Sequence, residues 1–155
     1  MLRRVSLLLA AVAVTVALSA GVAQAGGAHS ASTSTPAPPA IHEPFASSPL
    51  PCSGAPGHRT TLQLEGCLER GILKTDATIE GLDRSIVSLL GKASPQRGFI
   101  AGVRAWLAYR SADCEAMSGV YEGGTLAGVV YAECVAARNV QRIADLRKFR
   151  SIASA

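Results

Sequence analysis

"RAWLAYRSADCEAMSGVYEGGT", residues 104–125, decides the fold, because helical spacing runs here into a glycine-rich loop. Mostly apolar side chains recur at intervals of three and four, which predicts one face of an amphipathic helix. That face comprises Phe99, Val103, Trp106, Leu107, Arg110 and Cys114. Ser94 and Pro95 favour a helix start, since proline lacks an N–H that the first turn leaves unpaired. Gly119 is the expected end of this helix.

A second helix is predicted before this stretch. Thr60 and Gln63 have the spacing of a capping box at its start. Its apolar series is Leu62, Leu64, Leu68, Ile72, Ile79, Leu82, Ile86, Leu89 and Leu90. Gly91 is the expected stop. Glycines inside the series predict a bend between Gly71 and Thr78, because each costs about 1 kcal/mol of helix stability relative to alanine.

A third helix is predicted after the loop. Thr125, which follows Gly123 and Gly124, is its expected cap. The inward stripe is expected to comprise Leu126, Val129, Val130, Cys134, Ala137, Val140, Ile143, Leu146 and Phe149. No strand pairs and no internal repeat are evident. The sequence therefore predicts an all-α domain at residues 51–150, a small bundle of about three helices packed antiparallel through short connections.

The N-terminus has the features of a secretory signal over residues 1–25. Arg3 and Arg4 precede an apolar run, and Ala23-Gln24-Ala25 is a small-x-small cleavage site, so the mature chain is expected to begin at Gly26. The apolar run is short for a membrane span and lacks a stop-transfer flank, so no stable span is expected after cleavage. The first cysteine lies far downstream at residue 52, which argues against a lipid anchor. A secreted or envelope-exposed protein follows.

Residues 26–50 are rich in Ser, Thr, Pro and Ala. A segment such as STSTPAPPA cannot bury enough apolar surface to offset the entropy of ordering it. A flexible, disordered spacer is therefore expected here, which leaves about 105 residues for one domain with a modest core.

The four cysteines of this exported chain predict disulfides. They are Cys52, Cys67, Cys114 and Cys134. Three connectivities are possible, and Cys52–Cys67 with Cys114–Cys134 is favoured because both bonds close local loops. Each would stabilise the fold by roughly 3 kcal/mol in the chain-entropy model.

Metal binding is the rival use of these cysteines. No pair has Cys-x-x-Cys spacing, and the histidines lie outside the predicted helices, at His29, His42 and His58. No metal site and no cofactor are therefore expected.

The net charge is mild. Without Arg3 and Arg4, 13 of the 15 basic residues remain against 11 acidic ones, which puts the mature chain near +2. Nucleic acid binding would call for a clustered basic stripe and is not expected. The C-terminal RIADLRKFR, residues 142–150, is locally basic. A solvated helix face is favoured there over membrane or polyanion binding.

The polar cluster of residues 106–115 has two interpretations. Trp106 and Arg110, four apart, share one side of the helix, and Tyr109 and Asp113 share the neighbouring side. Arg110 and Asp113, three apart, could also pair. The favoured interpretation is structural: Trp106 fills the core, and the polar side chains hold the helix end and the following loop.

Catalysis is the alternative interpretation. Nucleophilic chemistry needs a nucleophile and a base, yet no histidine lies near the cluster and Cys114 is expected in a disulfide. Asp113, Glu115 and Glu122 could act as a carboxylate pair on a sugar, as in a hydrolase. Acidic residues are common near helix ends, so a non-enzymatic protein is favoured.

Three segments resemble the signature of the LprI-type lysozyme-inhibitor domain: WLAYRSADCE at 106–115, YEGGT at 121–125 and VYAEC at 130–134. That signature joins a tryptophan, a Tyr/Phe-Arg pair, an acid and a cysteine to a later Gly-Gly and a second cysteine. The matching residues are Trp106, Tyr109, Arg110, Asp113, Cys114, Gly123, Gly124 and Cys134. Upstream and downstream, Cys52, Cys67, Arg138, Arg142 and Leu146 also fit, so the resemblance covers residues 52–148.

The resemblance implies a secreted or envelope-exposed helical domain that binds and inhibits lysozyme. Lysozymes hold two carboxylates in a sugar-binding cleft, which an inserted loop can block. The candidate binding loop is residues 117–125, with Tyr121 as an aromatic anchor and Glu122 beside it. The alternative is that its glycines serve only the turn and the helix cap. A chain near +2 is expected to gain no long-range attraction to a basic animal lysozyme.

A different function remains open, a module that binds the cell wall or another envelope component without inhibiting an enzyme, with the spacer providing reach. The sequence does not specify the oligomeric state.

Overall fold

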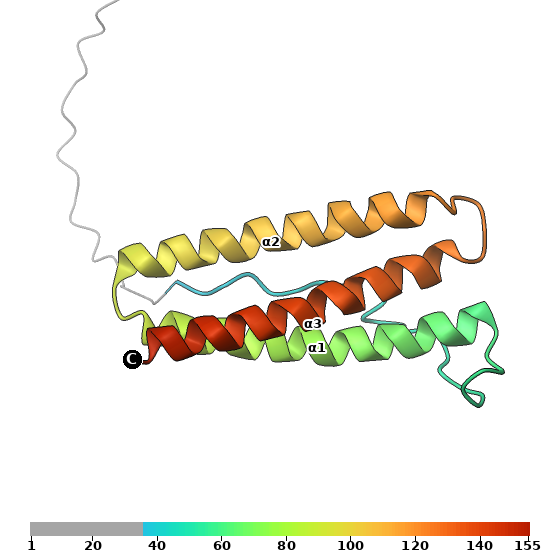
Figure 1. The fold of residues 1–155 in the computed structure, drawn as a ribbon, viewed down its shortest axis with the longest axis horizontal. Helices are drawn as coiled ribbons and strands as arrows, with labels where there is room; N and C mark the ends of the chain where they lie inside the picture. The colour runs from blue at the N-terminus through green and yellow to red at the C-terminus, as the bar shows by residue number, and fades with distance from the viewer. Residues whose placement is uncertain (1–35) are drawn as a thin grey trace, which may run out of the picture. The chain divides into compact units, whose positions relative to one another are not determined.

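The computed structural model describes residues 36–155, which contain three helices. They are α1 (Thr61–Leu89), α2 (Ala93–Gly119) and α3 (Ala127–Ala153) (Figure 1). The predicted all-α fold with three helices is confirmed. The predicted signal peptide, and the spacer up to residue 35, lie outside the described residues. From residue 36 onward, none of the helices is both long and apolar enough to cross a bilayer.

Two tight connections set the order of the helices. α2 runs antiparallel to α1 and α3, whereas α1 and α3 lie side by side and run in the same direction (Figure 1). The most extensive helix–helix interface joins these two parallel helices, and α1 touches α2 only sparsely. Antiparallel packing is thus right for consecutive helices, but the core lies mainly between α1 and α3.

Residues 40–50, which are extended as far as Glu43 and then turn over residues 44–48, fill the space that the helices leave open; we call this segment the strap. Ile41 and Glu43 face inward from the extended part, and Phe45 faces inward from the turn. Ile41 and Phe45 pack against the two halves of the core, and Glu43 is buried. The backbone N–H of Ile41 donates to Glu80 of α1 (2.8 Å). The strap therefore belongs to the folded domain.

This packing differs from the expected flexible spacer at residues 26–50. Most of this region is Ser, Thr, Pro and Ala, but the short run IHEPF, residues 41–45, contains the three side chains that pack on the helices, Ile41, Glu43 and Phe45. The backbone N–H of Leu50 also donates to the carboxylate of Glu69 (2.6 Å). For residues 40–50, these contacts offset the ordering entropy on which the spacer prediction rested.

α1 begins with the predicted capping box. The Gln63 N–H donates to Thr60 Oγ1 (3.3 Å), and the Thr60 N–H donates to Gln63 Oε1 (3.1 Å). The helix ends at Leu89, two residues before Gly91, which has a φ of +59°. The stop is therefore as predicted.

The expected bend between Gly71 and Thr78 is wrong, because α1 is one continuous helix through this segment. Gly71 and Gly81 lie on its exposed side. Burial of Ile72 and Ile79 from the same segment against α3 and its neighbours outweighs the modest helix-propensity cost of the glycines.

α2 begins at Ala93, one residue before the predicted Ser94-Pro95 start, and ends at the predicted Gly119. The predicted Thr125 cap of α3 is wrong. α3 begins at Ala127, and Leu126 at the N-cap has helical backbone angles and makes no side-chain cap bond. Successive turns through Gly124 lead directly into the helix, so the chain never adopts the extended conformation that a threonine cap requires.

The inward stripe of α3 is only partly as predicted. Val129, Cys134 and Leu146 are buried, whereas Val140 is 64% exposed. Leu126, Ala137 and Phe149 are also exposed. The buried positions instead include Ala132, Val135 and Asn139. α3 packs against two helices at once, so its buried face is not the one that its most apolar side chains mark.

Both predicted disulfides are present. Cys52–Cys67 fastens the segment after the strap to α1, and Cys114–Cys134 joins α2 to α3.

Candidate functional site

Arg110, at the centre of the signature stretch, is a buried residue of the core, with a side chain 8% exposed. Its Nη1 donates to Asp76 Oδ1 of α1 (2.9 Å) and to Asn139 Oδ1 of α3 (2.8 Å). Its Nη2 pairs with Glu43 of the strap. We call Glu43, Asp76, Arg110 and Asn139 the polar layer. A single guanidinium thus connects the strap and all three helices.

Asn139 completes the polar layer. Its Nδ2 donates to Asp76 Oδ1 (2.8 Å) and to Thr75 Oγ1 (2.9 Å). Apolar clusters lie on either side of the layer, one around Ile72 and the Cys114–Cys134 disulfide, the other around Ile79, Ile86 and Leu146. The layer therefore fixes how far α1, α2 and α3 can slide past one another.

Two carboxylates share the one guanidinium of this layer. Burial raises the pKa of Glu43 and of Asp76, although the nearby Arg110 charge acts in the opposite direction. Asp76 Oδ2 is buried and has no hydrogen-bond partner. Burial thus dominates over ion pairing for both groups, which makes the layer sensitive to any loss of the Arg110 charge.

Trp106 lies between two guanidinium groups. Arg110 and Arg142 each place their Cζ atom 5.1 Å from the centre of a Trp106 ring. Arg142 also pairs loosely with the buried Asp83 of α1 (3.8 Å). Burial raises the pKa of Asp83 to about 6 and lowers the pKa of Arg142. These contacts agree with the structural interpretation of Trp106 and Arg110.

The neighbouring side of α2 carries an exposed group. Asp113 Oδ2 accepts a hydrogen bond from Arg138 Nε of α3 (2.8 Å) and forms an ion pair with Arg138 Nη2 (2.8 Å). The Arg138 guanidinium lies 5.7 Å from the ring of Tyr109, which is 51% exposed. The pairing of Arg110 with Asp113 that their spacing allowed does not form. Arg110 points into the core, while Asp113 reaches across to α3.

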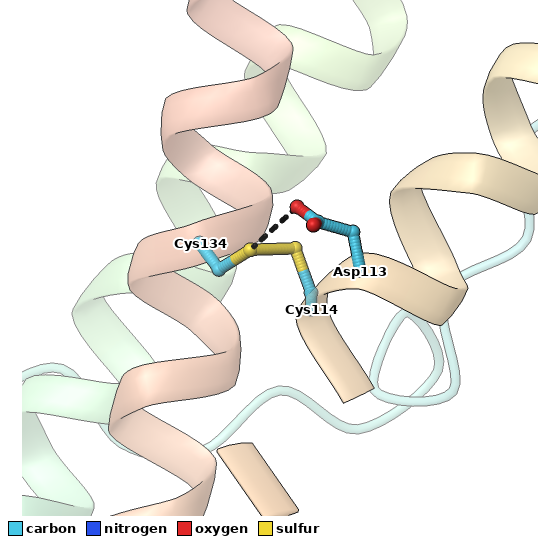
Figure 2. Close-up of side chains that lie close together, drawn as sticks. All are labelled: Asp113, Cys114 and Cys134. Atoms are coloured by element: carbon cyan, nitrogen blue, oxygen red, sulfur yellow. Dashed lines mark hydrogen bonds between the residues drawn. A yellow bond between two sulfur atoms is a disulfide. The ribbon is translucent and has the colours of Figure 1, made fainter. Parts of the chain in front are cut away.

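Figure 2 shows Asp113 beside the Cys114–Cys134 disulfide. The three side chains come close enough to resemble a metal-ligand set, and Asp113 Oδ2 lies 3.9 Å from Cys134 Sγ. Both sulfurs are bonded to each other, however, so neither is available as a thiolate ligand. Asp113 is engaged by Arg138 as well. The arrangement braces the ends of α2 and α3 against each other.

A hollow of about 350 Å³ with both polar and apolar walls lies between the strap and α2. Glu43 and Arg110 reach it, and Ser111, Glu115 and Tyr131 line it. The Ser111 hydroxyl donates to Glu115 Oε1 (2.8 Å), and burial raises the pKa of Tyr131. The two opposite charges that reach this hollow, Glu43 and Arg110, are already paired with each other.

The last turn of α2 and the loop between α2 and α3 expose a group of apolar side chains that we call the tip. It comprises Met117 (47% exposed), Val120 (81%), Tyr121 (45%) and Leu126 (46%). Glu122 lies on the same loop and is exposed. Gly123 has a φ of +78°, a conformation that side chains disfavour, so it is needed for the turn itself. The tip is anchored, because the Cys114–Cys134 disulfide joins the helices on both sides of it.

Four polar side chains that matter most to the interior are absent from the sequence predictions: Glu43, Asp76, Asp83 and Asn139. A signal existed for two of them. Asp76 and Asp83 fall in phase with Ile72, Ile79 and Ile86, within the apolar stripe of α1. A carboxylate in such a stripe indicates a buried partner of opposite charge.

The chain was compared with protein-family models, curated proteins and solved structures. No curated protein and no solved structure matches the chain. The family model described as lysozyme inhibitor LprI matches residues 52–146, which is more than half of the chain and includes α1, α2, both disulfides and most of α3. The chain therefore belongs to the LprI lysozyme inhibitor family.

Proposed function

We propose that this protein is a secreted, non-enzymatic inhibitor that binds lysozyme through the tip. The observation that carries the proposal is the exposure of Met117, Val120, Tyr121 and Leu126 within ten residues at the disulfide-braced connection of α2 and α3. Several exposed apolar side chains close together in a small domain are typical of a protein-binding surface. Membership of the LprI family supports lysozyme as the partner.

The shape of the tip suits insertion into a cleft. Tyr121 offers a large contact area at a low cost in side-chain entropy, which is why tyrosine is frequent among interface anchors. Gly123 and Gly124 add no side-chain bulk beside it. The disulfide between α2 and α3 limits the motion of the loop before binding, which reduces the entropy lost on association.

The charge around the tip also favours a basic partner. Residues 111–137 contain four acidic residues and no lysine or arginine: Asp113, Glu115, Glu122 and Glu133. The net charge near +2 led us to expect no long-range attraction to a basic lysozyme. That single value does not reveal that this segment carries acidic residues and no basic ones. Asp113 is paired with Arg138, which leaves Glu115, Glu122 and Glu133 as acidic groups near the apolar tip. Such groups increase the rate of encounter with a basic protein at low salt.

In this mechanism the inhibitor acts by exclusion. The tip occupies the sugar-binding cleft, and Tyr121 and Val120 displace substrate from the subsites near the catalytic carboxylates. Glu122 faces basic side chains at the rim of the cleft. No chemical step on the inhibitor is required, and Asp113 keeps its ion pair with Arg138 throughout.

Lytic assays with cell-wall substrate test the proposal. Titration of lysozyme with exported protein should reduce the lytic rate at micromolar concentration. Tyr121→Ala should weaken inhibition by about 30-fold, as expected for an anchor worth about 2 kcal/mol. Val120→Ser should weaken it less, because valine offers a smaller contact area.

Val140→Ser is the matched control, since Val140 is also an exposed valine but lies on α3 outside the tip. It should leave inhibition unchanged. An unchanged lytic rate at micromolar protein would refute inhibition. If the protein instead sedimented with purified cell wall, the envelope-binding alternative would replace our proposal.

A further inference from the structure

The end of the bundle opposite the tip has a different chemistry. It is formed by the connection from α1 to α2 and by the last turns of α3, which come together there (Figure 1). We call it the basic end. Three large apolar side chains are exposed on it: Leu89 (42%), Phe149 (42%) and Ile152 (67%). Phe149 contacts Phe99 of α2, with ring centres 5.3 Å apart.

The segments that form the basic end also carry four exposed cations. They are Lys92 at the start of α2 and Arg147, Lys148 and Arg150 in α3. None of the four forms an ion pair with another residue in the range 36–155. Asp145 is the one exposed acid of the last three turns of α3, and it accepts a hydrogen bond from Gln141. The cations are therefore available to an external anion.

A cavity of about 430 Å³ extends the apolar surface between α2 and α3. Leu90, Pro95, Phe99, Leu146 and Phe149 line it, and Arg142 lies at its inner end. Gly98 and Gly102 also line it, and a Cβ atom at either position would meet nothing within 4 Å, so the space beside them is open. The basic end thus joins a recessed apolar surface to unpaired positive charge.

We propose that the basic end docks on an anionic lipid surface, with Phe149 and Ile152 entering the interfacial region and Lys148 and Arg150 contacting headgroups. Exposed aromatic and aliphatic side chains flanked by lysine and arginine are typical of segments that lie in the membrane interface. A polyanionic polymer would account for the cations but not for the exposed apolar side chains. The lipid surface accounts for both.

The geometry along the helices agrees with this orientation. A helix of the length of α3, 27 residues, spans about 40 Å, so the tip is held several Debye lengths from the lipid. The acidic residues near the tip are then not repelled by anionic headgroups. Docking through the basic end leaves the tip pointing away from the membrane, free to meet a protein.

Vesicle co-sedimentation of the exported protein tests the proposal. Vesicles of phosphatidylcholine with phosphatidylglycerol should bind the protein in a salt-sensitive manner, and vesicles of phosphatidylcholine alone should not. Because each cation near an anionic surface contributes about fivefold in affinity, Lys148→Gln with Arg150→Gln should weaken binding by about 25-fold. Ile152→Ser should weaken it severalfold, since Ile152 no longer buries apolar surface.

The controls match these variants in charge and polarity. Arg70→Gln with Lys74→Gln removes two exposed charges from α1, and Val140→Ser removes an exposed aliphatic side chain from α3 outside the basic end. Both should bind vesicles like the unchanged protein. Equal losses in the two charge variants would overturn the proposal, because net charge alone would then govern binding. The proposal would also be overturned if Ile152→Ser bound anionic vesicles as tightly as the unchanged protein, or if the unchanged protein did not bind them at low salt.

Discussion

Two arginine–carboxylate groups lie one turn apart on α2 and differ in almost every physical respect. Arg110 faces inward, where it binds Glu43 and Asp76, and its side chain is 8% exposed. Asp113 faces the α3 side, where it binds Arg138, whose side chain is 39% exposed. Burial therefore separates a group that holds the fold from one that solvent can replace, although the residue types are the same.

The largest expected effect comes from removing the inward charge. Arg110→Met should destabilise the fold by about 3–5 kcal/mol, because Glu43 and Asp76 would remain buried without their cation. Arg138→Met, the same change on the outward side, should cost less than about 1 kcal/mol. Chemical denaturation of both variants measures the difference. Similar losses would show that burial does not distinguish the two groups.

Two glycines on α1 give the same contrast between a buried and an exposed position, without any charged group. A Cβ atom at Gly66 would lie 2.6 Å from the carbonyl oxygen of Pro51, whereas one at Gly71 would meet nothing within 4 Å. Gly66→Ala should destabilise by about 1–3 kcal/mol through overpacking. Gly71→Ala should stabilise by about 0.4–1 kcal/mol. If both variants were stabilised, the segment after the strap would not pack on α1 as described.

The buried carboxyl groups predict that the folded state becomes more stable as pH falls from neutral to mildly acidic values. The pKa of Asp83 is raised from 3.8 to about 6, so the folded state binds the proton more tightly than the unfolded state. Protonation of Asp83 therefore stabilises the folded state. This stabilisation is complete below the pKa of the unfolded state, 3.8, and is lost as pH rises through about 6. The raised pKa values of Glu43 and Asp76 act with the same sign.

Tm should therefore rise by a few degrees between pH 7.5 and pH 5. Asp83→Asn should flatten this profile, because the amide does not titrate. Thermal unfolding followed by circular dichroism at a series of pH values measures both. A Tm that falls over this range, or an identical profile for Asp83→Asn, would contradict the assignment of Asp83.

The smallest effect is expected on the outward side. Asp113→Asn removes the charge that meets Arg138 but keeps a hydrogen-bond acceptor, so the cost should stay below about 0.5 kcal/mol. The measurement is the denaturation midpoint at low and high salt, and the small loss should vanish at high salt. A loss above 2 kcal/mol would place Asp113 among the buried structural groups.

Local signals explain why much of the fold was predictable. The capping box at Thr60 and Gln63 acts within four residues, and helix periodicity needs only a dozen or so. The even cysteine count and the short loops between partners indicated both disulfides. The signature residues from Trp106 to Cys134 also pointed to the family that the comparison shows.

Predictions that required knowledge of distant neighbours were wrong. The Arg110–Asp113 pair was plausible from spacing, but Arg110 meets partners 34 and 67 residues away in the chain. The strap lies in a region of disorder-prone composition, and only the groove between the helices makes its order favourable. The buried face of α3 depends on two neighbouring helices, which its own pattern of apolar residues does not reveal.

By itself, the sequence determined the three helices, their order, the two covalent bonds between cysteines and the family. These depend on backbone propensity, on periodicity over short windows and on residue identities, all of which are local properties of the chain. Only the tertiary structure decided that the strap inserts Glu43 beside Arg110 and that Asp76 and Asn139 complete the polar layer. Burial and long-range proximity set those features, because the cost of a desolvated charge depends on which groups the folded chain brings next to it.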